Sequence, residues 1–247
     1  LLSHTGGTRL AERRLGRPWF ATWTRGLRLN EVVNGYVGRI PFESQPGTKF
    51  AYSGIGTDIA AGAIEAAAGT PRNQLLTEEF ANPLGMKYTR FRDSAAVAAL
   101  PPLPTRYYHG DKGELLVYDG LPVPSTNTYS SSGGSIISTA TDLAQWLAMI
   151  RNHGLHRGDS FLSTKAIQEM LTPVSPGNRT RGGFAILRED DHGTALAIGH
   201  SGSSGTYCWL DFQTDVIGIM LTQTKGSDIK TFRLELVQKI NACLAEK

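Results

Sequence analysis

The sequence has few cysteines, since only Cys208 and Cys243 occur among its 247 residues. Two cysteines cannot form the disulfide framework that holds small secreted domains together. A single bridge between them is one alternative, but two buried thiols are the expected state. The histidines show no spacing with carboxylates or thiols that is typical of a metal site. The sequence therefore predicts no metal and no cofactor.

Long apolar runs and a strong charge bias are also lacking. No apolar run approaches the about 18 residues that a membrane-spanning helix needs. The net charge is only +3, and the one basic cluster, Arg9 to Arg28, is interrupted by aromatic residues. Such a cluster is typical of a solvated face, so neither nucleic acid nor a membrane span is predicted. The 40% of hydrophobic residues can, however, bury the core of one or two domains.

What is present predicts an α+β fold. Apolar spacing indicates a helix beginning near Ile55 and ending at Gly69, and Thr139 with Asp142 approximates a capping box before a second helix. Four strand-like runs follow, and their spacing predicts an antiparallel meander. These runs are Gly183–Leu187, Thr194–Ile198, Thr206–Leu210 and Val216–Thr222, and the closing helix is expected to turn Ile229, Phe232, Leu236, Val237, Ile240, Cys243 and Leu244 toward the sheet.

Two stretches are candidates for a functional role because neither has the pattern of a regular helix or strand. Ala95–Asn127 holds five prolines and three tyrosines, which is typical of a binding loop or lid, the alternative being a surface excursion. Residues 199–205, Gly-His-Ser-Gly-Ser-Ser-Gly, lie between two predicted strands and expose backbone N–H groups beside His200, whose ordinary pKa is ~6.5. The alternative is a glycine-rich hairpin with a solvated histidine. The run nearly spells the Gly-x-Ser-x-Gly nucleophile elbow, but its fifth residue is Ser203 and a strand follows where the elbow needs a helix.

Five stretches, taken together and in this order, resemble the serine β-lactamase and penicillin-binding-protein superfamily, in its branch of class C β-lactamases, D-aminopeptidases, D-Ala-D-Ala carboxypeptidases and related esterases. They are residues 1–7 (Leu-Leu-Ser-His-Thr-Gly-Gly), 50–54 (Phe-Ala-Tyr-Ser-Gly), 83–89 (Pro-Leu-Gly-Met-Lys-Tyr-Thr), 132–143 (Ser-Gly-Gly-Ser-Ile-Ile-Ser-Thr-Ala-Thr-Asp-Leu) and 199–202 (Gly-His-Ser-Gly). The resemblance implies an antiparallel sheet flanked by the terminal helix, plus a mostly helical domain. Residues 1–175 would form the helical domain, and 176–247 the last part of the α/β domain, whose N-terminal part is expected to be absent from this chain.

The resemblance also implies acyl transfer through a serine ester. The family's nucleophile is a serine followed one helical turn later by a lysine (Ser-x-x-Lys), aided by a tyrosine and two backbone oxyanion donors. By position, Tyr52 is the implied base partner, His200 lines the substrate strand where its charge could bias Tyr52, and Ser203 supplies one oxyanion N–H. The implied substrate-binding positions are Ser53, Gly54, Ser201 and Gly202. Alternatives are that Tyr52 only packs at a helix start and that Ser53 only caps that helix.

The chain departs from the family pattern in three places. The family's Ser-x-x-Lys precedes the first motif, so the nucleophile and its lysine are expected upstream of this chain, and Ser227–Lys230 fits the pattern only by chance. Gly54 stands where the family has an asparagine that binds the substrate amide, which favours esters; Asn127 is a possible substitute, although a turn residue is the simpler interpretation. His200 stands where many members of the family have lysine. At this position the chain resembles many esterase and D-amino-acid peptidase members.

The leading hypothesis is therefore a serine hydrolase that acts on a small-molecule ester, or on a peptide or amide with a D-residue. A non-catalytic relative that serves as a binding module and a true β-lactamase are the alternatives. Export from the cytoplasm is expected from the family resemblance alone.

Overall fold

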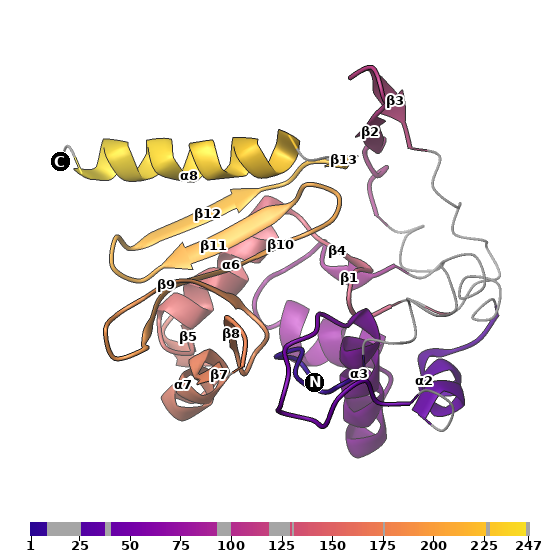
Figure 1. Ribbon diagram of the computed structural model, residues 1–247. Helices are drawn as coiled ribbons and strands as arrows, with labels where there is room; N and C mark the ends of the chain where they lie inside the picture. The colour runs from indigo at the N-terminus through magenta and orange to yellow at the C-terminus, as the bar shows by residue number, and fades with distance from the viewer. Residues whose placement is uncertain are drawn as a thin grey trace.

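The computed structural model describes residues 1–8, 26–37, 41–92, 100–118, 129, 131–174, 176–225 and 228–245. Its centre is a six-stranded antiparallel sheet in the order β12-β11-β10-β9-β8-β7 (Figure 1). The strands are β7 (Pro173–Val174), β8 (Arg179–Thr180), β9 (Ala185–Glu189), β10 (Ala195–Ser201), β11 (Tyr207–Asp211) and β12 (Val216–Met220). The predicted meander is confirmed as β9 to β12. The pair β7–β8 was not predicted, because two-residue strands carry no readable alternation.

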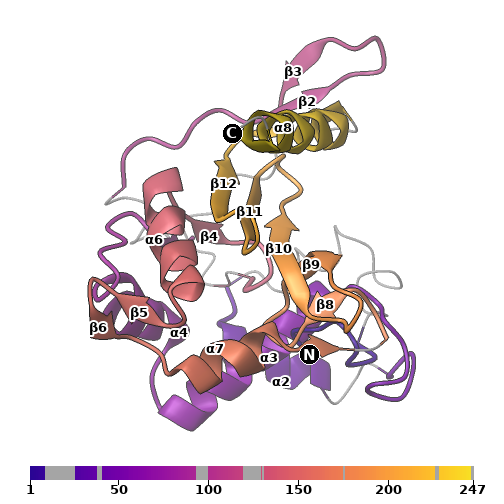
Figure 2. The same cartoon turned by 90° about the vertical axis from the view of Figure 1, so that its left-hand side faces the viewer.

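Two helices, α6 (Ala140–Arg151) and α7 (Thr164–Leu171), pack against this sheet (Figure 2). Their buried side chains meet those of the strands in one core, which includes Leu147, Ile150, Ile167, Ile198 and Leu210. This core contains residues from both sides of the domain boundary predicted after residue 175.

Thr139 caps α6 as predicted, because its hydroxyl accepts the N–H of Asp142 at 3.2 Å. The Asp142 carboxylate turns away and accepts the N–H of Tyr88 and the hydroxyl of Thr89, at 2.7 and 2.9 Å.

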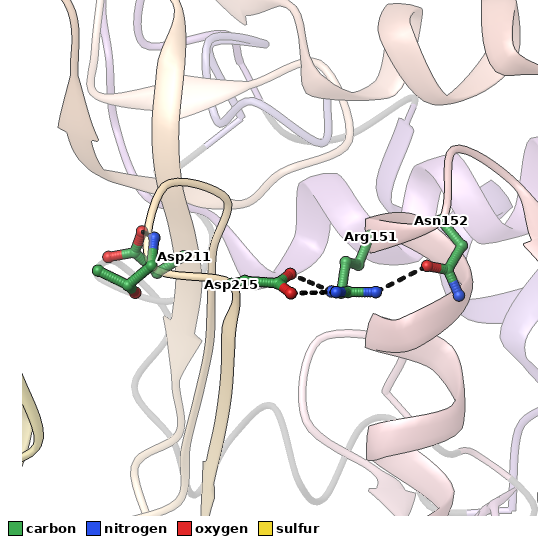
Figure 3. Close-up of polar contacts among 5 residues, drawn as sticks. Arg151, Asn152, Asp211 and Asp215 are labelled. Atoms are coloured by element: carbon green, nitrogen blue, oxygen red, sulfur yellow. Dashed lines mark hydrogen bonds and ion pairs between the residues drawn. The ribbon is translucent and has the colours of Figure 1, made fainter. Parts of the chain in front are cut away.

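The C-terminal end of α6 is joined to the turn between β11 and β12. The Arg151 guanidinium forms a two-pronged contact with Asp215 and donates to the Asn152 side chain at 2.9 Å (Figure 3). Asp211, also drawn in Figure 3, fixes the turn because its carboxylate accepts the N–H groups of residues 213 and 214, each at 3.0 Å. The Arg151–Asp215 pair is exposed, so it orients the helix end more than it stabilises the fold.

The first part of the chain is mainly helical. It contains α2 (Leu29–Val37), α3 (Gly54–Ala68) and α4 (Arg72–Leu75), which continues as the π-helical turn η1 (Leu76–Ala81). The predicted α3 is confirmed, and it ends at Gly69, which has a left-handed φ of 63°. Two short strand pairs lie outside the large sheet: β1 (Arg90–Phe91) pairs with β4 (Ile136–Ile137), and β5 (Leu155–His156) pairs with β6 (Asp159–Ser160) in the segment between α6 and α7.

The proline-rich stretch contains regular structure that the sequence did not predict. Strands β2 (Tyr107–His109) and β3 (Leu115–Val117) form a hairpin, and β13 (Thr224–Lys225) pairs in parallel with β2. Residues 95–99 and 119–127 of the stretch, Asn127 among them, lie outside the described residues.

The closing helix α8 (Asp228–Ala245) runs beside β12 (Figure 1). Ile229 lies close to Gly205, where an added Cβ would come within 3.0 Å of the Ile229 side chain, and Arg233 donates to the Thr206 carbonyl at 3.3 Å. The prediction that Phe232 and Cys243 face the sheet is wrong, because both side chains are exposed. Both cysteines are free, and the exposed Cys243 also contradicts the expectation of two buried thiols.

None of the helices in the described ranges is long and apolar enough to cross a membrane.

Candidate active site

The start of the chain and the segment before α3 form one backbone unit. The carbonyls of His4 and Gly7 accept the N–H groups of Ala51 and Glu43, each at 2.8 Å. Gly7 has a φ of +73°, and a Cβ there would lie 2.2 Å from the carbonyl oxygen of Ser44, so only glycine fits. The first two family-like motifs are therefore paired in space, and their pairing fixes the backbone that leads into Tyr52.

His4 holds the Tyr52 ring and the backbone after it. The two ring centroids are 4.0 Å apart, and the His4 Nδ1 accepts the N–H of Ser53 at 3.2 Å. An accepting Nδ1 places the proton of the neutral ring on Nε2. Burial, followed by the positive charges of Arg179 and His200, lowers the pKa of His4 to about 4. The imidazole is therefore neutral at neutral pH, with only 3% of its surface exposed.

Ser53 and Tyr52 point to different surroundings. The Ser53 hydroxyl accepts the N–H of Gly56 at 3.1 Å, lies 3.0 Å from the hydroxyl of Thr8, and is buried. Ser53 thus has the capping role that the sequence left as an alternative, and its hydroxyl is used inside the fold. The side chain of Tyr52 is 45% exposed. The same dipeptide therefore supplies one structural hydroxyl and one accessible phenol.

A buried carboxylate, Asp58, fixes the glycine turn beside Gly54. It accepts the hydroxyl of Tyr129 at 2.6 Å, the N–H of Ser132 at 2.5 Å and the hydroxyl of Ser131 at 3.2 Å. Gly133 of this turn approaches so closely that a Cβ there would lie 3.4 Å from the Cα of Gly54. The sequence analysis missed Asp58; the available signal was one acidic residue in the mostly apolar first half of α3.

His200 lies near the end of β10, across from Tyr52. Their ring centroids are 6.4 Å apart with 45° between the ring planes. The backbone of His200 is paired with Cys208 of β11, which sets the position of the ring at the sheet. Burial first, and then the charge of Arg179, lower the pKa of His200. Like His4, this histidine favours its neutral form.

The turn after His200 is a tight hairpin, in agreement with the strands predicted on both sides of it. The N–H of Gly202 donates to Thr206 at 2.8 Å, and the N–H of Gly205 donates back to Gly202 at 3.1 Å. Within the described part of the chain, the N–H of Ser203 makes no hydrogen bond, and both Ser201 and Ser203 are exposed. The strand β11 that follows excludes the nucleophile elbow, which requires a helix.

Arg179, on β8, is a charged group of the site that sequence analysis missed. Its guanidinium carbon lies 5.9 Å from the centroid of the Tyr52 ring and 6.0 Å from that of Phe50. Burial lowers the pKa of Arg179. No carboxylate of the described ranges lies within salt-bridge distance of it. Nothing in the sequence marked Arg179, because β8 is two residues long and lies outside every motif.

No three of the described His, Cys, Asp and Glu side chains lie close enough together to hold a metal ion.

The lowered pKa of His4 predicts an acid-dependent loss of stability. The unfolded chain takes up a proton on this histidine near pH 6.5 but the folded chain only near pH 4, so stability falls as the pH drops through that interval. The slope is at most about 1.4 kcal/mol per pH unit. His4→Asn is the matched variant, because asparagine does not titrate and tolerates the positive φ of 58° at this position. Between pH 7.5 and 5, urea unfolding of the wild type should lose about 2 kcal/mol more than the variant. Equal losses in the two proteins would contradict the buried neutral state of His4.

Comparison with known proteins gives the family. The family model described as Beta-lactamase matches residues 1–241. The D-alanyl-D-alanine-carboxypeptidase/endopeptidase AmpH of Escherichia coli K12 is 30% identical over 132 residues, which are 53% of this chain and 29% of AmpH. The N-acetylmuramyl-L-alanine amidase of Bacillus subtilis strain 168 is 25% identical over 220 residues, 78% of this chain and 48% of the amidase. This chain thus spans less than half of each of these relatives.

A solved structure shows the same fold at lower identity. EstCE1, described as a hydrolase with promiscuous acyltransferase activity, superimposes with a TM-score of 0.68 at 19% identity, covering 91% of this chain and 66% of EstCE1. The predicted α+β fold of the β-lactamase/transpeptidase type is thereby confirmed. Because the family model covers nearly the whole sequence, this chain belongs to the beta-lactamase family.

Proposed function

We propose that Tyr52, His200 and the turn at Ser203 form one side of the acyl-transfer site of a serine hydrolase. The observation that carries this proposal is the placement of Tyr52. Its phenol is exposed, its ring is held by the buried His4, and it faces His200 across 6.4 Å between ring centroids. A tyrosine that only packed at a helix start would need neither the accessible phenol nor the second histidine.

In the proposed mechanism, a nucleophilic serine attacks the substrate carbonyl while the Tyr52 oxygen takes the proton of the serine hydroxyl. The bond between the carbonyl carbon and the leaving-group oxygen then breaks as Tyr52 passes that proton to the departing oxygen, which leaves the acyl-enzyme and a free alcohol. Water later hydrolyses the acyl-enzyme. The N–H of Ser203 donates to the negatively charged carbonyl oxygen, and Ser201 and Gly202 align the substrate along the edge of β10. The serine and lysine of the family's Ser-x-x-Lys are proposed to come from outside residues 1–247. Ser227 is a poor candidate, because it precedes α8 and stands after every family-like motif.

The proposed substrate is an ester in preference to an amide or a β-lactam. Gly54 has no side chain to bind a substrate amide, and a neutral His200 holds a carboxylate less firmly than lysine does. The acyltransferase activity described for EstCE1 supports acyl transfer, whereas the names of AmpH and the B. subtilis amidase favour a D-alanyl-D-alanine peptide or an N-acetylmuramyl-L-alanine amide as the alternative substrate. Export from the cytoplasm and the division after residue 175 also remain proposals.

A fluorophosphonate probe tests the proposal on the native protein. We expect one covalent adduct by intact mass, mapped by peptide analysis to a serine outside residues 1–247, together with faster turnover of a p-nitrophenyl ester than of a chromogenic cephalosporin or a D-Ala-D-Ala peptide. An adduct on Ser227 would overturn the placement of the nucleophile. The absence of both adduct and turnover would favour the non-catalytic binding module. Faster hydrolysis of the cephalosporin would favour a true β-lactamase.

A further inference from the structure

We propose that Thr222 is a positioning residue that orients and polarises the N–H of Ser203, the proposed donor to the carbonyl oxygen of the substrate. Thr222 lies between β12 and β13, outside every family-like motif. This inference rests on the proposed function of the Ser203 N–H and adds to it the residue that sets its direction. The connection runs through two peptide units of the turn between β10 and β11.

The hydroxyl of Thr222 is bonded to the backbone of this turn. It donates to the carbonyl oxygen of Ser204 at 3.2 Å. The approach is close, because a Cβ at Gly205 would collide with the Thr222 hydroxyl oxygen and lie 2.7 Å from the carbonyl oxygen of Thr224. Gly205 also has a φ of +89°, so glycine is required there on both counts. The turn therefore rests directly on the segment that carries Thr222.

A second hydrogen bond continues from the same peptide unit. The Ser204 carbonyl shares this unit with the N–H of Gly205, which donates to the Gly202 carbonyl at 3.1 Å. The Gly202 carbonyl in turn shares its peptide unit with the N–H of Ser203. The C=O and N–H of a trans peptide unit are coplanar and point in opposite directions. The bond from Gly205 therefore fixes the direction of the Ser203 N–H, and Thr222 fixes the peptide unit that makes this bond.

The same two bonds increase the strength of the Ser203 N–H as a donor. A carbonyl that accepts a hydrogen bond makes the N–H of its own peptide unit more polar, so consecutive bonds strengthen one another. Thr222 stands at the start of this series, and the Ser203 N–H, which makes no hydrogen bond within the described ranges, stands at its end. A donor that is aligned before the substrate binds needs no reorganisation during the reaction.

The other side of the turn is held independently of Thr222. The carbonyl of Thr206 accepts the N–H of Gly202 at 2.8 Å and the guanidinium of Arg233 at 3.3 Å. Arg233 belongs to α8, which begins at the end of the sheet where this turn lies (Figure 1). Loss of the Thr222 hydroxyl is therefore expected to change the direction and strength of one N–H without releasing the turn.

Three variants of the native protein separate this role from a purely structural one. Thr222→Val removes the hydroxyl and keeps the shape, whereas Thr222→Ser keeps the hydroxyl. Thr77→Val is the matched control, because the Thr77 hydroxyl is also half-buried and donates to a backbone carbonyl, at 2.8 Å. With a p-nitrophenyl ester, Thr222→Val should lower kcat about tenfold and leave KM unchanged, since removing an oxyanion donor altogether costs about 10²–10³ in kcat. Thr222→Ser should restore most of kcat, and Thr77→Val should keep it.

Amide hydrogen exchange, followed for single residues by NMR, tests the series of hydrogen bonds without any activity. Without the Thr222 hydroxyl, the Gly205 N–H is a weaker donor and its bond to Gly202 opens more readily. The Gly205 amide should therefore exchange severalfold faster in Thr222→Val than in the wild type, Thr222→Ser or Thr77→Val.

The two measurements together decide the inference. Wild-type kcat in Thr222→Val overturns it, because the Ser203 N–H would then act independently of Thr222. A lower kcat with unchanged Gly205 exchange, or one that serine does not restore, also overturns it, because the loss would arise by another route. A native protein without fluorophosphonate adduct or ester turnover removes the proposed hydrolase. In that protein, faster Gly205 exchange in Thr222→Val retains the link from Thr222 to the Ser203 peptide unit, and unchanged exchange removes that link as well.

Discussion

Replacing Tyr52 with phenylalanine is expected to lower kcat/KM for an aryl ester by about two to four orders of magnitude, the usual contribution of a positioned general base. The phenyl ring keeps the contact with His4, whose ring centroid lies 4.0 Å from that of Tyr52, and only the proton-accepting oxygen is lost. The exposed phenol carries no structural hydrogen bond in the described ranges, so unfolding should be unaffected. The loss should therefore fall on kcat, with fluorophosphonate labelling slowed in parallel.

Tyr88→Phe is the matched control for this prediction. Tyr88 is 44% exposed against 45% for Tyr52, and its role in the fold is played by its backbone N–H, which Asp142 binds. This variant should keep wild-type kcat/KM. A loss below tenfold in Tyr52→Phe, with the same small change in Tyr88→Phe, would remove Tyr52 from the mechanism and favour a tyrosine that only packs at the start of α3.

The sequence allowed the accessible half of the site to be predicted, because that half lies in short motifs with fixed residue types. Tyr52 and His200 were both named from such motifs, and the structure brings their rings to 6.4 Å. Their proposed roles remain to be tested. Arg179 could not be named, because it reaches Tyr52 only through the pairing of β8 with β9, a contact between segments that no local pattern encodes.

Several motif residues prove to be structural once the fold is known. His4 accepts the N–H of Ser53, and Asp142 accepts the hydroxyl of Thr89, so each joins two motifs that are distant in the sequence. A resemblance built on such residues identifies the fold firmly, because these bonds are needed whatever the enzyme acts on. For the same reason it says little about the substrate.

Asp58→Ala is expected to lower the free energy of unfolding by about 3 kcal/mol or more. Asp58 is 2% exposed and accepts hydrogen bonds from Tyr129, Ser131 and Ser132. Alanine would leave these donors without their acceptor in a buried place, at about 1–3 kcal/mol for each that water cannot reach. Asp58→Asn should lose less, because an amide keeps one accepting oxygen. Urea unfolding measures both values, and Asp191→Ala, at an exposed carboxylate with no hydrogen bond in the described ranges, should change stability by less than about 0.5 kcal/mol.

The same substitution also tests how the glycine turn supports the site. Asp58 binds Ser132, and the adjoining Gly133 rests on Gly54, two residues after Tyr52. If this turn holds the start of α3, Asp58→Asn should reduce ester turnover under conditions where the protein remains folded, because a base displaced by about 1 Å loses much of its effect. Full activity in a destabilised Asp58→Asn protein would show that the turn stabilises the fold without positioning Tyr52. In that case the pairing of the N-terminal residues with the segment before α3, through His4 and Gly7, would be sufficient to place the phenol.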